Sequence, residues 1–485
     1  MTRSFKMFVR QASKLLPLCL AVCVVSQTYA WAGSEAGERG RNAPQRLDTS
    51  GTVGGSDAGP RIAMDDEGNA IAVWVQFDGL PQEYGLWANR YTERKGWGEP
   101  ERINDYVGQA SSPSVAMNKR GAAVVVWVEY PVFDPDNPSV SFYSALWMSR
   151  YAPGTGWQEP QLVDDEALPL FPIVALDDEG NAIVAYHRIN AATDANVYAR
   201  HLPADGSVGA ATLLQQSDTA LGTAHQLGMN SRGDAMVVWN EFDRDALTWK
   251  MWSNRFDPAT AWSGPELIPG AEGGYIQTSG LGVDAHGNAM VAFTAMNADN
   301  YQQNAYASRY DVASGWEQPA LLQAGTDFNA DYLTLGMNSG GEVHVVWREL
   351  VDMWSYPFVY QMHSNRYRPG IGWGESLLIG ESSSNFSGST RIAVDKKGNA
   401  FAVWLQLNPD AQTDPYAYPP MNVYAYRFSD RRGQWNQGRN LQPGVNEAYL
   451  PDLAMDKKGK AMAVWSSMDT STYETNAWAA RLHKR

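Results

Sequence analysis

The sequence predicts an all-β fold built from repeats, on two observations. The first is a recurring stretch: residues 60–74 read PRIAMDDEGNAIAVW, and similar stretches begin at positions 113, 390 and 451. The turn Asp or Asn of each copy follows the previous one by 53 to 61 residues, at positions 65, 118, 177, 230, 284, 338, 395 and 456. The second is that runs rich in Val, Ile, Trp and Tyr are bounded by Gly, Pro and Asp, as strands are. A strand repeat of about 50 residues is typical of rings or solenoids, and we expect almost no helix.

Each repeat is predicted to contain four strands. Strand A precedes the turn, as in RIAM (61–64), and strand B follows it, as in AIAVWVQF (70–77). After a variable B–C loop comes strand C, as in LWANRY (86–91), and a Gly-Trp turn leads to strand D, as in EPERI (99–103). The strand-C arginine recurs in seven of the eight copies, as in Arg150, and we expect it to have a structural partner within its own repeat.

Three positions explain why the copies look alike. A glycine follows every turn Asp or Asn by three residues, as Gly68 follows Asp65. This pair suits a hairpin in which Asp or Asn binds backbone amides and glycine takes a positive φ. Strand A has Ala or Gly two residues before the turn, as Ala63, which we expect where the innermost strands crowd around an axis. Strand B carries an aromatic residue, as Trp74, which we expect to pack one sheet on the next.

The two ends of the chain predict a closed ring. The last repeat stops after its strand C (NAWAARL, 476–482), whereas APQRLD (43–48) resembles the strand-D segment EPERIN (99–104). The N-terminal segment would then complete the last sheet and remove exposed sheet edges. A solenoid has no reason for such a split repeat. The sequence therefore predicts one domain, residues 33–485, folded as an eight-bladed β-propeller of four-stranded blades whose ring is closed by an N-terminal strand.

The repeat resembles those of secreted bacterial β-propellers over nearly all of residues 33–485. Its D-x-x-G-N-A-x-x-V-W stretch is similar to the Asp-box of sialidase-type propellers, in which a turn Asp precedes a glycine and then an aromatic residue. It departs from the Asp-box, which has Ser or Thr two residues before its Asp and a closer aromatic. Asp-boxes are structural hairpins in that family, so the resemblance implies a propeller fold and no catalytic role for the turn.

The N-terminal residues 1–32 are predicted to be a secretory signal peptide. Four basic residues within positions 3–14 precede the apolar run LLPLCLAVCVV (15–25), and Ala30 and Ala32 form a cleavage site. We expect cleavage near one of these alanines and a periplasmic or secreted product. Both cysteines, Cys19 and Cys23, lie in this segment, so the remaining chain would hold no disulfide. A lipid anchor at Cys23 is disfavoured, because Val22 stands where a small residue is needed.

The chain is acidic, and its charge limits the partners it could bind. The formal net charge of −15 becomes −19 once the four basic residues of the signal peptide are removed. This acidity argues against nucleic acid and anionic lipid, since both are polyanions held by Lys and Arg. No later apolar run is long enough to predict a membrane span. We expect a monomer whose partner is a carbohydrate or a protein.

The first group of candidate site residues lies where the repeats differ. The B–C loops vary in length and are aromatic and acidic, and function often resides in such loops on a uniform scaffold. The third repeat departs most from the others, with a Tyr in place of the strand-B Trp. Two explanations need no function: strand ends are ordinarily polar, and the copies of a repeat diverge in sequence. The candidates at the B–C end of strand B are Glu129, Tyr130, His187, Arg188, Asn240, Glu241, Arg348 and Glu349.

These residue types suggest two kinds of chemistry near the third repeat. A His or Tyr base beside an arginine would suit elimination from a uronic polysaccharide, and spaced carboxylates would suit glycoside hydrolysis. A second candidate group lies at the ring closure, where Arg61, Arg391 and Asp452 hold equivalent positions at the start of strand A. This group would hold an anionic ligand near the axis, or form a salt-bridge cluster that fastens the ring.

No cofactor is expected. The loop residues Asp134, Asp136, Asn137, Asp410 and Asp414 offer at most a weak Ca²⁺ site, and the seven His show no paired zinc spacing. The sequence favours a protein that binds a carbohydrate or a protein partner through the B–C loop face, rather than an enzyme. One alternative is a carbohydrate-active lyase or hydrolase with a site over the third repeat. Another is a scaffold in a cell-envelope assembly.

Overall fold

The computed structural model describes residues 43–48, 59–77, 83–104, 108–131, 144–189, 195–216, 221–297, 301–325, 329–352, 354, 359–383, 388–408, 420–442 and 446–483. The described residues belong to one compact unit. The predicted signal peptide with both cysteines, and the loop residues of the weak Ca²⁺ sites, lie outside the described residues.

The described residues form strands and no helix, which confirms the all-β prediction. No helix that could cross a membrane occurs among them. The innermost strands, which correspond to strand A, are β2 (Arg61–Met64), β7 (Gly108–Met117), β12 (Leu168–Leu176), β16 (Leu221–Met229), β20 (Ile276–Val283), β25 (Asn329–Met337), β30 (Arg391–Val394) and β35 (Glu447–Met455). The second strands, which correspond to strand B, are β3 (Ala70–Phe77), β8 (Ala123–Pro131), β13 (Ala182–Ile189), β17 (Ala235–Asp243), β21 (Ala289–Met296), β26 (Val343–Asp352), β31 (Ala400–Leu407) and β36 (Ala461–Met468).

The third and outer strands complete the sheets. The third strands are β4 (Tyr84–Thr92), β9 (Ala145–Ala152), β14 (Ala195–Leu202), β18 (Thr248–Asp257), β22 (Gln303–Asp311), β27 (Val359–Arg368), β32 (Met421–Ser429) and β37 (Thr475–Leu482). The outer strands are shorter than expected in most repeats and often split in two: β1 (Gln45–Arg46), β5 (Gly96–Trp97), β6 (Glu101–Arg102), β10 (Gly156–Trp157), β11 (Gln161–Asp164), β15 (Thr212–Leu213), β19 (Ala261–Gly273), β23 (Gly315–Trp316), β24 (Ala320–Leu321), β28 (Gly372–Trp373), β29 (Leu377–Ser383), β33 (Gln434–Trp435) and β34 (Arg439–Asn440).

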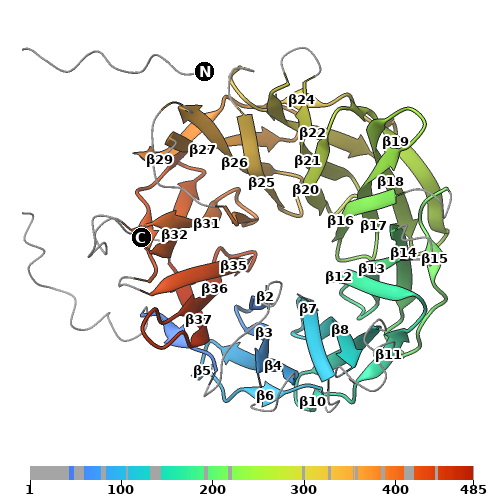
Figure 1. Cartoon of the computed structure of the whole chain (residues 1–485), viewed down its shortest axis with the longest axis vertical. Coiled ribbons are helices and arrows are strands. Elements are labelled where there is room, and N and C mark those ends of the chain that lie inside the picture. The colour runs from blue at the N-terminus through green and yellow to red at the C-terminus, as the bar shows by residue number, and fades with distance from the viewer. Residues whose placement is uncertain are drawn as a thin grey trace, which may run out of the picture. The chain divides into compact units, whose positions relative to one another are not determined.

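The strands pair antiparallel within each repeat, in the order of the sequence from the innermost strand outward. Most repeats form a separate sheet of four or five strands, and a single parallel pairing between Tyr84 and Gln109 joins the first two repeats into one ten-stranded sheet. Figure 1 shows the sheets of residues 43–483 arranged around a central opening, with the innermost strands toward it. Each innermost strand contacts that of the next repeat, and β35 contacts β2. This is the architecture of a β-propeller.

The turns between the first two strands have the predicted geometry. All eight turn glycines have φ between 77° and 94°, a region that residues with a side chain rarely adopt. In the first turn, Oδ1 of Asp65 accepts hydrogen bonds from the backbone N–H groups of Glu67 at 2.9 Å and Asn69 at 2.8 Å. The repeated Asp-x-x-Gly is therefore a structural hairpin, as expected.

The core lies between neighbouring sheets, as the strand-B aromatics predict. Trp127 of the second repeat, for example, packs in one cluster with Val73 and Leu86 of the first repeat. The small residue before the turn is confined by the next innermost strand: a Cβ added at Gly282 would lie 2.5 Å from Cβ of Met337. Larger side chains cannot be placed there without moving backbone.

The strand-C arginines differ in their partners. Arg255 and Arg309 pair within their own repeat, as expected, with Asp257 at 3.2 Å and Asp311 at 2.7 Å, whereas others connect neighbouring repeats. Arg150 donates to the carbonyl oxygens of Gly180 at 2.9 Å and Leu202 at 2.8 Å, both in the following repeat. Across the two ends of the chain, Arg481 forms an ion pair with Glu93 of the first repeat at 2.9 Å. The expectation of a partner within the same repeat is wrong for Arg150 and Arg481, because their side chains reach over the boundary between sheets.

The N-terminal segment pairs with the last strand. Gln45 and Arg46 of β1 lie opposite Ala479 and Trp478 of β37, as Glu101 and Arg102 of β6 lie opposite Ala88 and Trp87 of β4. The next polar residue also has the same role in both places. Oδ1 of Asp48 accepts from the backbone N–H of Ala477 at 2.9 Å, and Oδ1 of Asn104 accepts from that of Leu86 at 2.8 Å.

Candidate functional site

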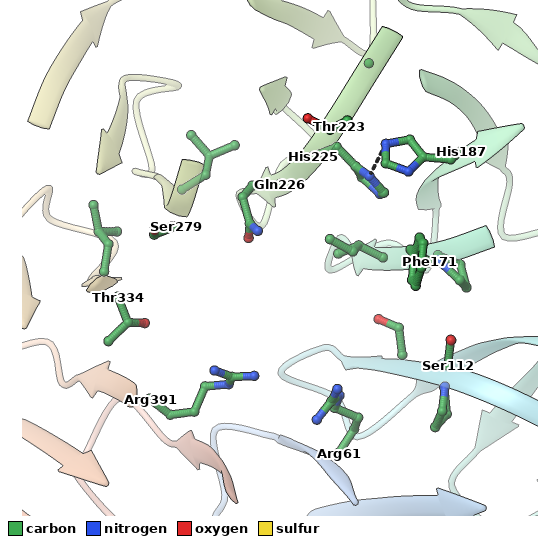
Figure 2. Close-up of a pocket in the computed structure, with 18 of the residues that line it drawn as sticks. Arg61, Ser112, Phe171, His187, Thr223, His225, Gln226, Ser279, Thr334 and Arg391 are labelled. Atoms are coloured by element: carbon green, nitrogen blue, oxygen red, sulfur yellow. Dashed lines mark hydrogen bonds between the residues drawn. The ribbon is translucent and has the colours of Figure 1, made fainter. Parts of the chain in front are cut away.

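A cavity of about 800 Å³ lies where the innermost strands meet. We call it the axial cavity, and Figure 2 shows the side chains around it. It is lined from β2, β7, β12, β16, β20, β25 and β30, and by His187 of β13 and Ala195 of β14. His187 and Ala195 adjoin the loop between the second and third strands, so the cavity reaches the B–C end of the ring. The polar side chains that line it are Arg61, Ser112, Ser114, His187, Thr223, His225, Gln226, Ser279, Thr334 and Arg391.

Arginine provides the charge of this cavity. Arg61 and Arg391 line it, and no Asp or Glu is among the described lining residues. Figure 2 shows both guanidinium groups reaching into the opening from the side of β2 and β30. Nε of Arg391 lies 3.4 Å from Oδ1 of Asp452, and Oδ2 of Asp452 accepts from the backbone N–H of Ile62 at 3.0 Å. The structure thus brings the predicted closure group together, with the two arginines on the cavity and Asp452 beside them.

A pair of buried histidines forms another part of the wall. Nδ1 of His225 on β16 lies 3.1 Å from Nε2 of His187 on β13, and Nε2 of His225 lies 3.2 Å from the carbonyl oxygen of Ala185. A carbonyl oxygen only accepts, so Nε2 of His225 carries a proton. When both rings are neutral, Nδ1 of His225 is then an acceptor, and Nε2–H of His187 donates to it. This assignment leaves the lone pair on Nδ1 of His187 available as an acceptor.

Burial keeps both imidazoles neutral at pH 7. It lowers the pKa of His225 to about 4, although hydrogen bonds to the backbone of Ala185 and Phe171 act in the opposite direction. Burial also lowers the pKa of His187 well below its ordinary value, and the neighbouring His225 lowers it further. Sequence reasoning identified His187 and missed His225. The signal was present, since His225 stands five residues before its turn Asn, where four other repeats have Pro.

An aromatic ring completes this side of the cavity. Phe171 lies on a bulge of β12, where the register against β13 shifts between Leu170 and Ile173. Its side chain lines the cavity and is 51% exposed, and its ring meets that of His187 edge-on at 6.2 Å between centroids. The backbone of Phe171 is left-handed, with φ of 51°.

The structure does not bring His187 and Arg188 into one group, as the prediction for the third repeat required. Neighbouring residues of a strand point to opposite faces, and Arg188 turns away from the cavity. Its Nε donates to Oδ2 of Asp164 at 3.1 Å and its NH1 to Glu166 at 3.0 Å. The hydroxyl of Tyr186 donates to the same oxygen of Asp164. Arg188 therefore belongs to a buried ion-pair network between the second and third repeats.

The predicted carboxylates Glu129 and Glu349 are buried in the sheets and do not form a rim on the loop face. Each accepts the indole N–H of the tryptophan two residues earlier, from Trp127 and from Trp347, in both cases at 2.7 Å. Glu129 also accepts from Nδ2 of Asn104. Desolvation by burial raises the pKa of Glu129 to about 7. The expected grouping of Glu129 with His187 is wrong, because the carboxylate of Glu129 lies in the core and is hydrogen-bonded to Trp127 and Asn104.

The remaining predicted residues lie outside the cavity lining. Asn240 is buried and donates to the carbonyl oxygen of Ile276 at 2.9 Å, and Nε of Arg348 donates to Asp331 at 2.6 Å. Glu241 and Tyr130 are partly buried near the ends of their strands, and burial raises the pKa of Glu241. Among the residues that the structure describes, no group of three or more His, Cys, Asp or Glu side chains could hold a metal ion.

Comparison with known proteins does not assign a family. No family model and no curated protein matches the sequence. Among solved structures, a puromycin hydrolase has a TM-score of 0.46 at 13% identity, covering 88% of this chain and 61% of its own. A polysaccharide lyase, the PL25 ulvan lyase, has 0.45 at 11%, covering 80% and 92%. The Hadza microbial sialidase Hz136 has 0.37 at 14%, covering 60% and 63%. This chain spans less than two thirds of the hydrolase and of the sialidase, and these similarities are too weak to indicate a function.

Proposed function

We propose that this chain binds an acidic carbohydrate in the axial cavity. The observation that carries the proposal is the pair of arginines, Arg61 and Arg391, in a cavity without a described lining carboxylate, inside a chain of net charge −15. In such a chain, a concave cationic site concentrates field lines and attracts an anionic group. Guanidinium groups hold carboxylates and sulfates by charge-assisted hydrogen bonds. Asp452 offsets part of the charge of Arg391 and holds its side chain in place.

The rest of the lining suits a ligand with several hydroxyl groups. Thr223, Gln226 and Thr334 offer hydroxyl and amide groups that both donate and accept. Nδ1 of His187 adds an acceptor that stays unprotonated at pH 7, and Phe171 adds an apolar surface. A simple inorganic anion would need none of these groups. A cavity of about 800 Å³ is large enough for one or more sugar rings.

Cleavage of the bound chain by elimination is the second candidate function, and the histidine pair favours it. Elimination from a uronate requires a base for the proton next to the carboxylate and a cation that neutralises that carboxylate. His187 with its free lone pair and the two arginines are the groups for these roles. The depressed pKa of His187 makes it a weak base, so binding without cleavage remains the first proposal.

A carbohydrate ligand also agrees with a secreted or periplasmic protein, which we propose on the N-terminal sequence. Two other proposals remain: a protein partner bound on the B–C loop face, and a scaffold role in the cell envelope. In the first proposal, the B–C loops would also contact the bound carbohydrate.

Binding assays with matched variants test the proposal. Purified protein is titrated with polygalacturonate, alginate, hyaluronan oligomers and sialyllactose, and with neutral galactan, by calorimetry. We expect at least one acidic glycan to bind and galactan not to bind. Arg391→Gln should weaken that binding about tenfold or more. Arg368→Gln, an exposed arginine at the end of β27 outside the cavity lining, is the control. Binding that is equal in all three proteins, or absent for every acidic glycan, would overturn the proposal.

The same samples test cleavage. Elimination leaves an unsaturated uronate that absorbs ultraviolet light, so the glycans that bind are incubated with the protein and their ultraviolet absorbance is followed. If the chain is a lyase, His187→Gln should abolish the signal and keep measurable binding, because the amide retains hydrogen-bonding capacity but cannot take up the proton. No signal from the wild type would leave binding as the function and remove elimination.

A further inference from the structure

Phe171 holds a backbone conformation that disfavours its side chain. The innermost strand of the third repeat bulges at this residue, with φ of 51°. Ser112, Tyr332, Ser389 and Leu450 occupy the same place in their repeats, six residues before the turn Asp or Asn, with φ between 46° and 64°. The left-handed conformation is therefore built into the repeat, and glycine is the residue it favours. A phenylalanine here carries a strain that glycine would remove.

The other large residues at this place, Tyr332 and Leu450, make their contacts outside the axial cavity. The guanidinium carbon of Arg348 lies 4.4 Å from the ring centre of Tyr332. Cβ of Leu450 lies so close to Gly59 that a Cβ added to this glycine would be 2.4 Å away. Neither residue is among those lining the axial cavity, whereas Phe171 is, and its ring contact with His187 is edge-on. Phe171 is 51% exposed and Tyr332 is 50% exposed, so it is the place of Phe171 on the cavity, and not its exposure, that distinguishes it.

Strained backbone and exposed apolar groups cluster at ligand sites, and Phe171 combines both with a place on the cavity wall. Figure 2 places Phe171 beside His187 and His225, across the cavity from Arg391. The apolar C–H face of a sugar ring can lie on an aromatic ring while its hydroxyl groups point outward. A ligand whose acidic group is held by the arginines would have such a face to offer to Phe171, and a small inorganic or aliphatic anion would not.

We infer that Phe171 is a specificity-determining residue of the axial cavity and that it selects acidic pyranose sugars over other anions by stacking on the sugar ring. This inference rests on the proposed binding of an acidic carbohydrate. It adds that the arginines supply attraction for any anion, and that the ring at the bulge supplies the preference for a sugar.

The test uses Phe171→Gly and compares a sugar with a plain anion. Titrations with the acidic glycan that binds the wild type should show about tenfold weaker binding or more, the range of one good aromatic contact. Titrations with citrate should be unchanged, since citrate has no pyranose face. Phe171→Tyr should keep the affinity for the sugar, because it keeps the ring. The melting temperature of Phe171→Gly should equal or exceed that of the wild type, because glycine relieves the left-handed strain.

Tyr332→Gly is the matched control, at the same place in another repeat and outside the cavity lining. It should leave sugar affinity unchanged. Sugar affinity that Phe171→Gly leaves intact, in a protein where Arg391→Gln weakens it, would overturn this inference and keep the proposed function. A Phe171→Gly protein that melts several degrees lower and weakens citrate and sugar alike would also overturn it, because the ring would then be part of the core. If no acidic glycan binds the wild type, both proposals fall.

Discussion

At the scale of single residues, the position two residues after the strand-B aromatic supplies the hydrogen-bond acceptor for that aromatic in four of the repeats. Gln76 accepts the indole N–H of Trp74 at 3.1 Å, and Gln406 accepts that of Trp404 at 3.3 Å, as Glu129 and Glu349 do in their own repeats. In the fifth repeat the aromatic is Phe293, which has no N–H, and the partner position holds Ala295. In these repeats the residue at this position thus has a structural role, whereas in the eighth repeat the indole N–H of Trp465 donates to Gln442 instead. An unpaired buried indole N–H would cost about 1 to 3 kcal/mol.

Glu129 provides a prediction with a defined pH window. Its pKa is raised from 4.5 to about 7 by burial, so the folded state favours the neutral acid. The stability that this preference contributes is present below pH 4.5 and is lost as the pH rises through 7. Glu129→Gln keeps an acceptor for Trp127 and carries no charge. We expect its stability relative to the wild type to increase by on the order of 2 kcal/mol between pH 5 and pH 8.5, measured by urea unfolding.

The reverse substitution in the first repeat is the control for this prediction. Gln76→Glu places a carboxyl group beside Trp74 in the equivalent surroundings, so it should introduce the same loss of stability above pH 7. A stability difference between Glu129→Gln and the wild type that is constant with pH would contradict the prediction, since it would mean that Glu129 ionises in the fold as freely as in the unfolded chain.

The candidate site could be predicted from the sequence only in part. His187, Arg61 and Arg391 were identified because they depart from the repeat or share an equivalent place near the axis, and all three line the cavity. Glu129 and Arg188 also differ from the repeat pattern, but they are hydrogen-bonded in the core, Glu129 to Trp127 and Arg188 to Asp164. The sequence shows that a residue differs, and it does not show which partner it meets across a sheet boundary. The left-handed bulge at Phe171 depends on the pairing of β12 with β13, which the sequence alone did not show.

At the scale of elements, the hairpin between the first two strands is where sequence and structure agree best. Its turn residue satisfies backbone groups that no strand partner reaches, and in three of the eight repeats Asn replaces Asp. Asn338 shows why both serve: its Oδ1 accepts from the backbone N–H groups of Gly340 at 2.9 Å and Glu342 at 3.1 Å, as a carboxylate would. The turns also contact one another, since Nδ2 of Asn338 donates to the carbonyl oxygen of Asp395 in the next repeat at 2.9 Å.

Asp395 is the turn residue at which this role can be measured. Its side chain is fully buried and accepts from the backbone N–H groups of Lys397 at 2.8 Å and Asn399 at 3.0 Å. Asp395→Ala leaves both donors without their partner and should cost about 2 to 3 kcal/mol in the free energy of unfolding. Asp395→Asn restores an oxygen acceptor and should recover most of that loss. Urea unfolding of the three proteins checks this, and equal stability of the Ala and Asn variants would show that the hairpin does not depend on the side-chain acceptor.

At the scale of the whole molecule, the repeat period determines the order of the strands, and the axial cavity is formed by residues that the separate repeats contribute near the axis. Seven innermost strands contribute to one cavity, and each supplies only a few residues, so the cavity is not visible in any one repeat. Arg391 of β30 and His225 of β16 are 166 positions apart in the chain and face the same space. A site of this kind requires the ring to be closed, because opening it would separate β2 from β35 and release Asp452 from Ile62.

Closure by the N-terminal strand is therefore the property of the whole molecule to test, and the repeats supply an internal standard. Leu47 is 1% exposed and packs against Trp74 and Met462, and its N–H donates to the carbonyl oxygen of Ala477 at 2.8 Å. Ile103 has the same place in the first sheet, 5% exposed, with its N–H donating to Leu86 at 2.8 Å. If β1 completes the last sheet in solution, Leu47→Ala should cost about as much as Ile103→Ala, on the order of 2 to 4 kcal/mol. Urea unfolding measures both, and a Leu47→Ala protein as stable as the wild type would mean that the N-terminal strand is detached and the ring is closed by side chains alone, among them Arg481 and Glu93.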